Sequence, residues 1–122
     1  LIKARINAGV PFLGICLGMQ LLFDESTEDG IHRGLGLLPG RVVRFASGLK
    51  IPQMGWNQVA QTRPDPIWEN LPDRSYFYFV HSYFCAPAME ADTLGRAEYG
   101  VPFTAAAARV KIKFRPAYSK PV

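Results

Sequence analysis

The chain has 122 residues, of which 48% are hydrophobic and 20% charged, and this balance is typical of one globular domain rather than a disordered or collagen-like chain. Fourteen lysines and arginines against ten aspartates and glutamates give a formal net charge of +4. The basic residues are scattered except near the C-terminus, so charge does not predict nucleic-acid binding. The longest apolar stretch, residues 10–23, is interrupted by proline, glycine and glutamine, which excludes a membrane span.

The chain contains two cysteines and two histidines. Cys16 and Cys85 lie in apolar segments without the spacing of metal ligands, which favours free thiols in a reducing compartment. We therefore expect a cytoplasmic protein with neither a metal nor a cofactor. Cys85 has no flanking glycines and is predicted to lie in the core, whereas His32, in an acidic, glycine-rich segment, is predicted to lie at the surface.

The opening residues predict a helix, because Ile2 and Ile6 are about one turn apart and Gly9 follows as a C-terminal stop. No methionine precedes Leu1, which we interpret as a truncated start. Neither an internal repeat nor a linker indicates a second domain. We therefore expect residues 1–122 to form part of a single domain.

The elements that follow predict an α/β fold. Residues 11–15 predict a short buried strand, residues 17–24 a two-turn helix, and the acidic, glycine-rich residues 25–40 a loop. Because a strand, a sharp turn and a helix make a βα unit, the predicted architecture is a mixed sheet flanked by helices. Further strands are predicted at residues 41–45, 56–59, 76–80, 94–99 and 103–108, with one helical turn at 66–71.

The junction between the predicted strand and helix reads Gly14-Ile-Cys-Leu-Gly18, the form of a nucleophile elbow that carries cysteine. Such a nucleophile sits on strained backbone, and the flanking glycines lack side chains so that strand and helix can approach. The backbone N–H of Leu17 can donate to an oxyanion, a contact worth roughly 3 kcal/mol. The helix N-terminus favours a thiolate. We predict that Cys16 is a nucleophile; the alternative is a small buried side chain, as most unpaired cysteines are.

The residues around this junction resemble a known family. Residues 11–23 resemble the nucleophile segment of class I, triad-type glutamine amidotransferases. Three further segments follow in the order of that family, at residues 34–45, 50–57 and 78–83, and within it they are most similar to the glutaminase subunits of imidazole glycerol phosphate synthases. The sequence Met-Gly-Trp-Asn at 54–57 is the most discriminating of these, and the likeness continues through Arg109.

The resemblance implies a flavodoxin-like fold whose first strands are missing here, and a glutamine-hydrolysing activity. Cys16 would attack the side-chain amide of glutamine and release ammonia. Gln20, one helical turn on, would contact the bound glutamine, and Ser82 and Tyr83 would hold its amino-acid end. Spacing alone makes His81 the better of the two histidines to act as a base, but the family places it near the substrate. We keep His81 as a substrate-binding candidate, the alternative being a hydrogen-bonded structural histidine.

The resemblance also implies a partner, a (β/α)₈-barrel cyclase that consumes the ammonia to make imidazole glycerol phosphate in histidine biosynthesis. Pro52, Met54 and Trp56 would lie where the two proteins dock. Free ammonia is protonated in water and stops being a nucleophile, so its release against an enclosed path makes the partner part of the mechanism. Before the family is considered, core packing explains Trp56 equally well.

The C-terminal residues depart from the family. Where the family has Phe-His-Pro-Glu, this chain has Phe114-Arg-Pro-Ala117, and neither Arg115 nor the alanine can serve as a base or orient one. The alternating apolar and basic residues 110–115 predict a strand with one solvated face. Residues 110–122 are therefore a divergent, decayed end or the product of a reading-frame or assembly error, and we favour the error because the upstream residues match.

Three functions remain open from the sequence. The first is a glutaminase subunit that supplies a cyclase. The second is a catalytically decayed module that only docks on a partner. The third is another class I amidotransferase, against which Met54-Gly-Trp-Asn57 argues.

Overall fold

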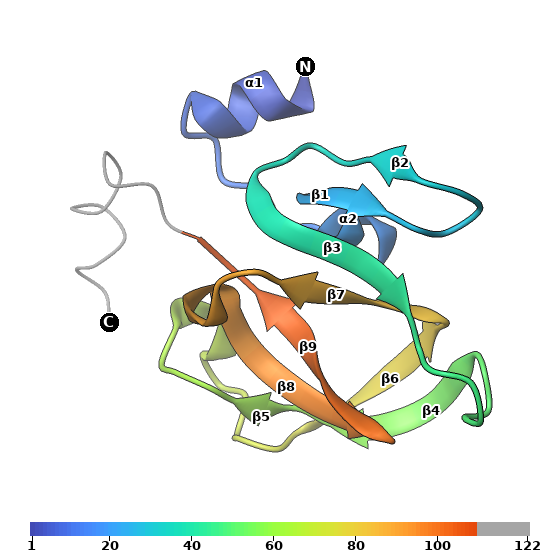
Figure 1. Ribbon diagram of the computed structural model, residues 1–122. Helices are drawn as coiled ribbons and strands as arrows, with labels where there is room; N and C mark the ends of the chain where they lie inside the picture. The colour runs from blue at the N-terminus through green and yellow to red at the C-terminus, as the bar shows by residue number, and fades with distance from the viewer. Residues whose placement is uncertain (110–122) are drawn as a thin grey trace.

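A computed structural model describes residues 1–109, and its strands form two sheets (Figure 1). The larger sheet has the order β2-β1-β3-β7-β9-β8-β5, and the smaller consists of β4 and β6. Within this part of the chain β1 and β3 are parallel and the other pairings antiparallel, so the sheet is mixed, as predicted. The elements are α1 (Ile2–Asn7), α2 (Leu17–Gln20), β1 (Phe23–Ser26), β2 (His32–Arg33), β3 (Leu38–Arg44), β4 (Gln53–Gln58), β5 (Ala60–Gln61), η1 (Pro66–Trp68), β6 (Tyr76–His81), β7 (Tyr83–Pro87), η2 (Glu90–Asp92), β8 (Thr93–Tyr99) and β9 (Val101–Ala107).

The first of two core clusters joins α2 to the larger sheet. Phe23 of β1, Leu38 and Val42 of β3, and Cys85 of β7 are all buried, as the sequence predicts for Cys85. The register pairs Val42 directly with Cys85 across β3 and β7. This cluster fixes the start of α2, because Met19 of that helix packs against it.

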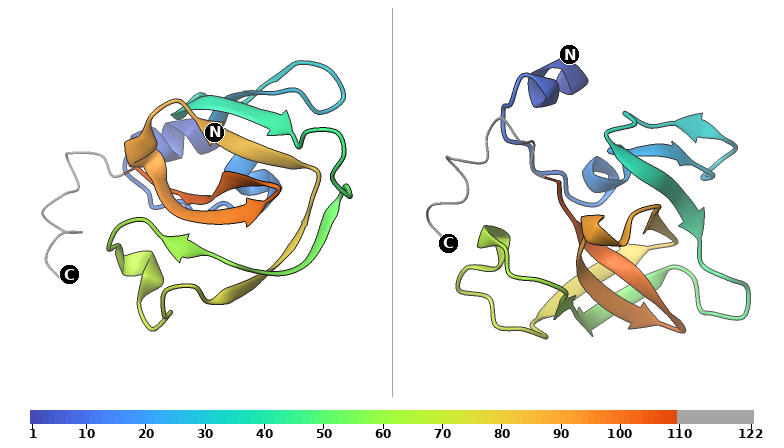
Figure 2. Two further views of the ribbon diagram at one scale, coloured as in Figure 1. Left: turned by 60° about the horizontal axis from the view of Figure 1, so that its bottom comes forward. Right: turned by 60° about the vertical axis from the view of Figure 1, so that its left-hand side comes forward.

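The second core cluster lies between the two sheets. Phe45, Val59, Ala97 and Phe103 are buried there, and the inward side chains of β6 pack against them. Residues along β6 alternate between exposed and half-buried, as expected of a strand with one face against a core. The β4–β6 pair therefore closes over β7, β9 and β8 on one side only (Figure 2).

Several predicted elements are present with shifted ends. The helix at the start spans Ile2–Asn7, with Gly9 in the left-handed region at φ 101°. It stands apart from the sheets, and its side chains are mostly exposed (Figure 1). The predicted turn at residues 66–71 is the single 3-10 turn η1, and the strands predicted in the second half are β6, β8 and β9. No helix within residues 1–109 is long and apolar enough to cross a membrane.

Other predictions of local structure are wrong. Residues 11–15 form no strand and are mostly exposed, because no neighbouring strand within residues 1–109 supplies the hydrogen bonds that an extended segment needs. The helix predicted at 17–24 ends at Gln20, since β1 begins at Phe23 and pairs with β3. The loop predicted at 25–40 holds the end of β1, β2 and the start of β3.

Two further differences concern the later part of the chain. The strand β7, Tyr83–Pro87, was not predicted, because its residues show no regular alternation and end in proline. The interpretation of residues 110–122, including the strand predicted at 110–115 and the departure at Phe114-Arg-Pro-Ala117, lies outside the described residues.

Candidate active site

Cys16 stands on strained backbone at the start of α2. It is the N-cap residue of that helix, with φ 56° and ψ −113°, a conformation that residues other than glycine rarely adopt. Such strain persists only where the surrounding structure holds it, and it concentrates at functional sites. The side chain of Cys16 is exposed and is not in a disulfide. The backbone therefore presents the free thiol of Cys16 at the surface on a sharp turn.

The two glycines of the turn differ in what surrounds them. A Cβ placed on Gly14 would lie 2.4 Å from the carbonyl carbon and oxygen of Gly18 and 2.8 Å from the backbone nitrogen of Met19. A Cβ on Gly18 would meet nothing within 4 Å. The steric requirement that the sequence assigns to both glycines therefore applies to Gly14 alone.

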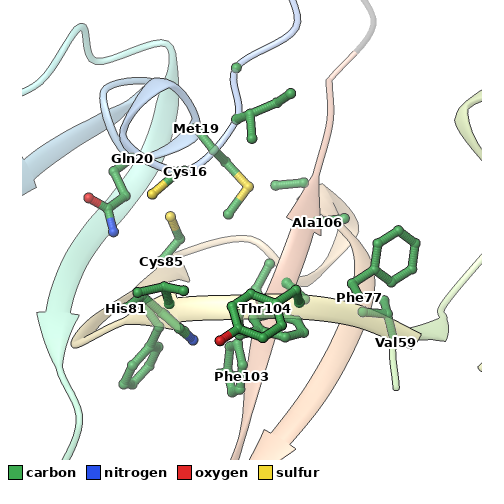
Figure 3. A pocket seen from close by; sticks show the side chains of 18 of the residues that line it. Cys16, Met19, Gln20, Val59, Phe77, His81, Cys85, Phe103, Thr104 and Ala106 are labelled. Atoms are coloured by element: carbon green, nitrogen blue, oxygen red, sulfur yellow. The ribbon is translucent and has the colours of Figure 1, made fainter. Parts of the chain in front are cut away.

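A pocket of about 440 Å³ opens beside the turn. Cys16 and Gln20 line it from one side, and His81 of β6 lines it from the opposite side (Figure 3). Tyr83, the first residue of β7, also lines the pocket. The rest of its wall is largely aromatic and aliphatic, supplied by β6, β9 and the η1 region. Its volume lies within the range of small-molecule sites, and its polar lining includes Cys16, Gln20 and His81.

Two of the residues predicted for the site lie outside that wall. Ser82 is not among the residues that line the pocket, and its carbonyl accepts a hydrogen bond from the N–H of Phe45 at 3.1 Å. The side chain of Leu17 is exposed and also lies outside the wall. No carbonyl of residues 1–109 accepts from the backbone N–H of Leu17, which leaves it free to donate to a ligand.

Both the backbone and the side chain of Gln20 form hydrogen bonds. Its backbone N–H donates to the carbonyl of Cys16 at 3.1 Å, and its side-chain Nε2 donates to the carbonyl of Tyr83 at 3.4 Å. The second bond joins α2 to the first residue of β7. The amide of Gln20 is thereby positioned in the pocket that also contains Cys16.

Both ring nitrogens of His81 have partners. Nδ1 lies 2.8 Å from the carbonyl oxygen of Tyr83, and Nε2 lies 2.7 Å from the side-chain oxygen Oε1 of Gln53. The rings of Phe45, Phe79 and Phe103 pack around the imidazole with centroid distances of 5.1 to 5.5 Å. This burial lowers the pKa of His81 below its usual 6.5, and the hydrogen bond to Tyr83 offsets part of the effect.

The lowered pKa of His81 predicts a stability that depends on pH. As pH falls through 6.5, the unfolded chain takes up a proton at this histidine before the folded protein does, so the free energy of unfolding decreases. Urea unfolding at pH 7.5 and 5.5 measures the change. His81→Gln should reduce the loss at low pH, whereas His32→Gln, at an exposed position, should leave it as in the wild type. An equal loss in both variants would contradict this assignment.

The two cysteines share the pocket but differ in environment. Cys85 is 1% exposed, and burial, with a smaller effect of the nearby Cys16, raises the pKa of its thiol to about 12. Figure 3 shows the two sulfur atoms pointing toward one another from opposite elements. Cys85 therefore lies in the pocket wall facing Cys16, and its buried thiol is protonated.

This difference predicts selective alkylation. At pH 8 a thiol with a pKa near 12 is ionised in only about one molecule in ten thousand, and the thiolate is the reactive form. We expect iodoacetamide to modify Cys16 at least about 100-fold faster than Cys85 in the folded protein. Peptide mapping by mass spectrometry distinguishes the two sites, and urea-unfolded protein, in which both should react, is the control. Modification of Cys85 first would contradict the described burial.

Gln53 is the site residue that sequence reasoning missed. It is 5% exposed, and its side chain contacts His81. One signal was available, because the apolar residues Pro52, Met54 and Trp56 lie two positions apart and Gln53 falls between them in the sequence. In a strand, that alternation places the glutamine on the inward face when its apolar neighbours face outward.

The outward face of the β4–β6 pair is apolar and exposed. Met54 is 64% and Trp56 70% exposed, and Pro52 just before β4 is exposed as well. The register places Trp56 opposite Tyr78, and their rings meet edge to face at 5.4 Å. We call this surface, made by Met54, Trp56, Tyr76, Tyr78 and Val80, the outer aromatic face. Core packing, the alternative explanation of Trp56, is wrong for the described chain.

The comparisons with known proteins place this site in a family. The family model "Glutamine amidotransferase class-I" matches residues 1–108. This match covers most of the chain and includes the elbow, the pocket and the outer aromatic face. The chain belongs to the class I glutamine amidotransferase family, as the resemblance in its sequence indicates.

The individual relatives give a more specific likeness than the family model. Each of the following three proteins is named imidazole glycerol phosphate synthase subunit HisH. The one from Desulfitobacterium hafniense (strain Y51) is 52% identical over 118 residues, which cover 94% of this chain and 56% of the relative. The one from Aromatoleum aromaticum is 53% identical over 114 residues, with 86% and 53% covered. The one from Syntrophotalea carbinolica is 45% identical over 131 residues, with 99% and 64% covered. The chain thus spans somewhat more than half the length of these relatives.

Proposed function

We propose that this chain is the glutamine-hydrolysing part of an imidazole glycerol phosphate synthase, which converts glutamine to glutamate and supplies the ammonia to a cyclase subunit. The observation that carries the proposal is Cys16, exposed on a strained turn at a pocket of about 440 Å³. Relatives that are about half identical and named as a subunit of that synthase support the choice of reaction.

The chemistry follows from the position of the sulfur. The thiolate of Cys16 attacks the side-chain amide carbon of glutamine, and the tetrahedral intermediate carries a negative oxygen. The free N–H of Leu17 donates to this oxygen. The amide nitrogen then takes a proton from water, the C–N bond breaks and ammonia leaves. A water molecule hydrolyses the remaining glutamyl thioester to glutamate and regenerates the thiol of Cys16.

The remaining predicted residues hold the substrate. Gln20, His81 and Tyr83 line the pocket, which supports a role in binding glutamine. Ser82 adjoins them in the chain but lies outside the pocket wall, so its proposed contact with the amino-acid end of glutamine requires a local rearrangement.

We assign the outer aromatic face, together with Pro52, to the docking of a (β/α)₈-barrel cyclase. Exposed aromatic and methionine side chains in one patch suit a protein interface, and the relatives are named as subunits. Hydrolysis against a partner keeps the ammonia away from water, where protonation would end its nucleophilicity. The unpaired thiols of Cys16 and Cys85 support a reducing compartment, and we place the protein in the cytoplasm.

One observation favours a second candidate, a decayed glutaminase that only docks on its partner. Within residues 1–109 no hydrogen bond joins the sulfur of Cys16 to a histidine or carboxylate, and His81 uses both ring nitrogens elsewhere. The family's Phe-His-Pro-Glu is replaced by Phe114-Arg-Pro-Ala117, outside the described residues. Loss of a general base lowers turnover by about 10²- to 10⁴-fold.

A glutamine-analogue chloroketone separates the two candidates. The glutaminase predicts one covalent adduct at Cys16, slowed by excess glutamine and absent from Cys16→Ser, as read by peptide mass spectrometry. Glutamate release by the protein, alone and with the cyclase, measures turnover in parallel. Binding of the cyclase without an adduct or turnover would establish the docking module, and labelling that glutamine does not slow would overturn the proposed substrate.

A further inference from the structure

Gln53 is a buried polar side chain to which the proposed reaction gives no role. It is 5% exposed at the first position of β4, and the register places it directly opposite His81 of β6. Its side-chain oxygen Oε1 is the atom placed 2.7 Å from Nε2 of His81, within hydrogen-bond distance. A buried polar group with a single well-placed partner is costly unless that bond is kept, which makes the contact with His81 specific.

The contact is the first link of a chain of hydrogen bonds that ends beside Cys16. His81 Nδ1 lies 2.8 Å from the carbonyl oxygen of Tyr83, and the same oxygen accepts from Nε2 of Gln20 at 3.4 Å. Gln20 belongs to α2, whose N-cap is Cys16. The side chain of Gln53 is thereby connected to the pocket through three successive contacts.

The hydrogen-bonding capacity of His81 fixes the direction of this chain. The titratable residues that line the pocket with His81 are Cys16, Cys85, Tyr83 and Tyr78, of which Tyr78 packs its ring against Trp56 on the outer aromatic face. The pocket wall contains no carboxylate or cationic side chain of residues 1–109. The imidazole ring is therefore neutral at pH 7 and has one N–H. The carbonyl of Tyr83 can only accept, so the proton is on Nδ1. Nε2 must then accept, which the oxygen placed beside it cannot satisfy. The oxygen and nitrogen of a carboxamide occupy nearly equivalent positions, so we exchange them, and the side-chain nitrogen of Gln53 becomes the donor to Nε2.

We propose that Gln53 is a positioning residue, which donates to Nε2 of His81, fixes the ring as its Nδ1–H tautomer, and through the Tyr83 carbonyl orients Gln20 in the pocket. With its amide N–H directed to Tyr83, Gln20 offers its Oε1 to the N–H groups of a ligand. Glutamine carries such groups at its ammonium and its carboxamide. The consequence for glutamine rests on the proposed function, whereas the tautomer of His81 does not.

Nitrogen-15 NMR of histidine-labelled protein tests the tautomer. The chain has two histidines, and His32→Gln assigns the His81 signals. We expect neutral His81 with the proton on Nδ1. Gln53→Glu places a carboxylate at Nε2 and should raise the pKa of His81 by about 1 or more. Gln58→Glu, on the same strand but opposite Tyr76, should leave the His81 titration within about 0.2 of the wild type. An Nε2–H tautomer in the wild type, or equal effects of the two variants, would overturn the proposal.

Glutamine affinity tests the consequence for Gln20. Calorimetric titration on the Cys16→Ser background avoids turnover, and we expect Gln53→Leu to weaken the Kd for glutamine about tenfold, the loss of one net hydrogen bond. Gln58→Leu should change the Kd less than about twofold. Equal affinity in Gln53→Leu would overturn the positioning role even if that variant is less stable. If the Cys16→Ser protein with Gln53 intact binds no glutamine, the proposed function fails, and the NMR result still decides the role of Gln53 at His81.

Discussion

Replacing Trp56 by alanine is expected to weaken the binding of the proposed cyclase partner by about 30-fold or more, equivalent to about 2 kcal/mol. Trp56 is 70% exposed in the described chain, and its ring meets Tyr78 edge to face at 5.4 Å. Removing an exposed ring should change the stability of the chain itself by less than about 0.5 kcal/mol. We therefore expect the substitution to lower the binding affinity rather than the stability of the chain. A tryptophan buried at the centre of an interface contributes most to binding.

Surface plasmon resonance with immobilised cyclase measures this loss. Ile31→Ala is a matched control, because Ile31 is 77% exposed but lies in the segment before β2, outside the outer aromatic face. Its affinity should stay within about twofold of the wild type. A Trp56→Ala protein that binds as tightly as Ile31→Ala would remove the outer aromatic face from the proposed interface.

The features that the sequence predicted well depend on neighbours in the chain. The turn at Cys16 arises from Gly14 and its approach to the backbone of Gly18, a contact that spans four residues. The alternation along Tyr76–His81 likewise follows from the geometry of one strand. Such local patterns are readable because the residues that determine them lie close together in the sequence.

The features that were missed depend on partners far away in the chain. Residues 11–15 carry the composition of a buried strand, but a strand forms only beside another, and none within residues 1–109 pairs with them. The contact between Gln53 and His81 joins residues 28 positions apart and follows from the β4–β6 register. Register depends on the packing of a whole sheet, so one sequence does not specify which polar residue faces His81.

Packing also changed the role that spacing suggested for His81. As one of two histidines in the chain, it was the better candidate for a base beside Cys16. In the structure its two ring nitrogens lie within hydrogen-bond distance of Tyr83 and Gln53, and phenylalanine rings pack around the imidazole. Neither ring nitrogen is therefore left without a partner in the described residues, which is an arrangement unlike that of a base beside Cys16.

The turn itself is expected to tolerate no side chain at Gly14. In Gly14→Ala the new Cβ would lie 2.4 Å from backbone atoms of Gly18, which cannot rotate away, so α2 must shift with Cys16 at its start. We expect the free energy of unfolding to fall by about 1–3 kcal/mol, as in other overpacked sites. A displacement of Cys16 by about 1 Å should slow its labelling by the glutamine-analogue chloroketone about 100-fold.

Gly18→Ala is the matched control, since it adds the same methyl group to the same turn. Nothing lies within 4 Å of the position that its Cβ would occupy, and alanine is favoured over glycine within a helix. Its stability should equal that of the wild type or exceed it by up to about 1 kcal/mol, with the labelling rate of Cys16 unchanged. Urea unfolding and the time course of adduct formation measure both quantities. If Gly14→Ala behaved like Gly18→Ala, close contact with the helix would not hold Cys16 in its strained conformation, and the geometry proposed for the nucleophile would be wrong.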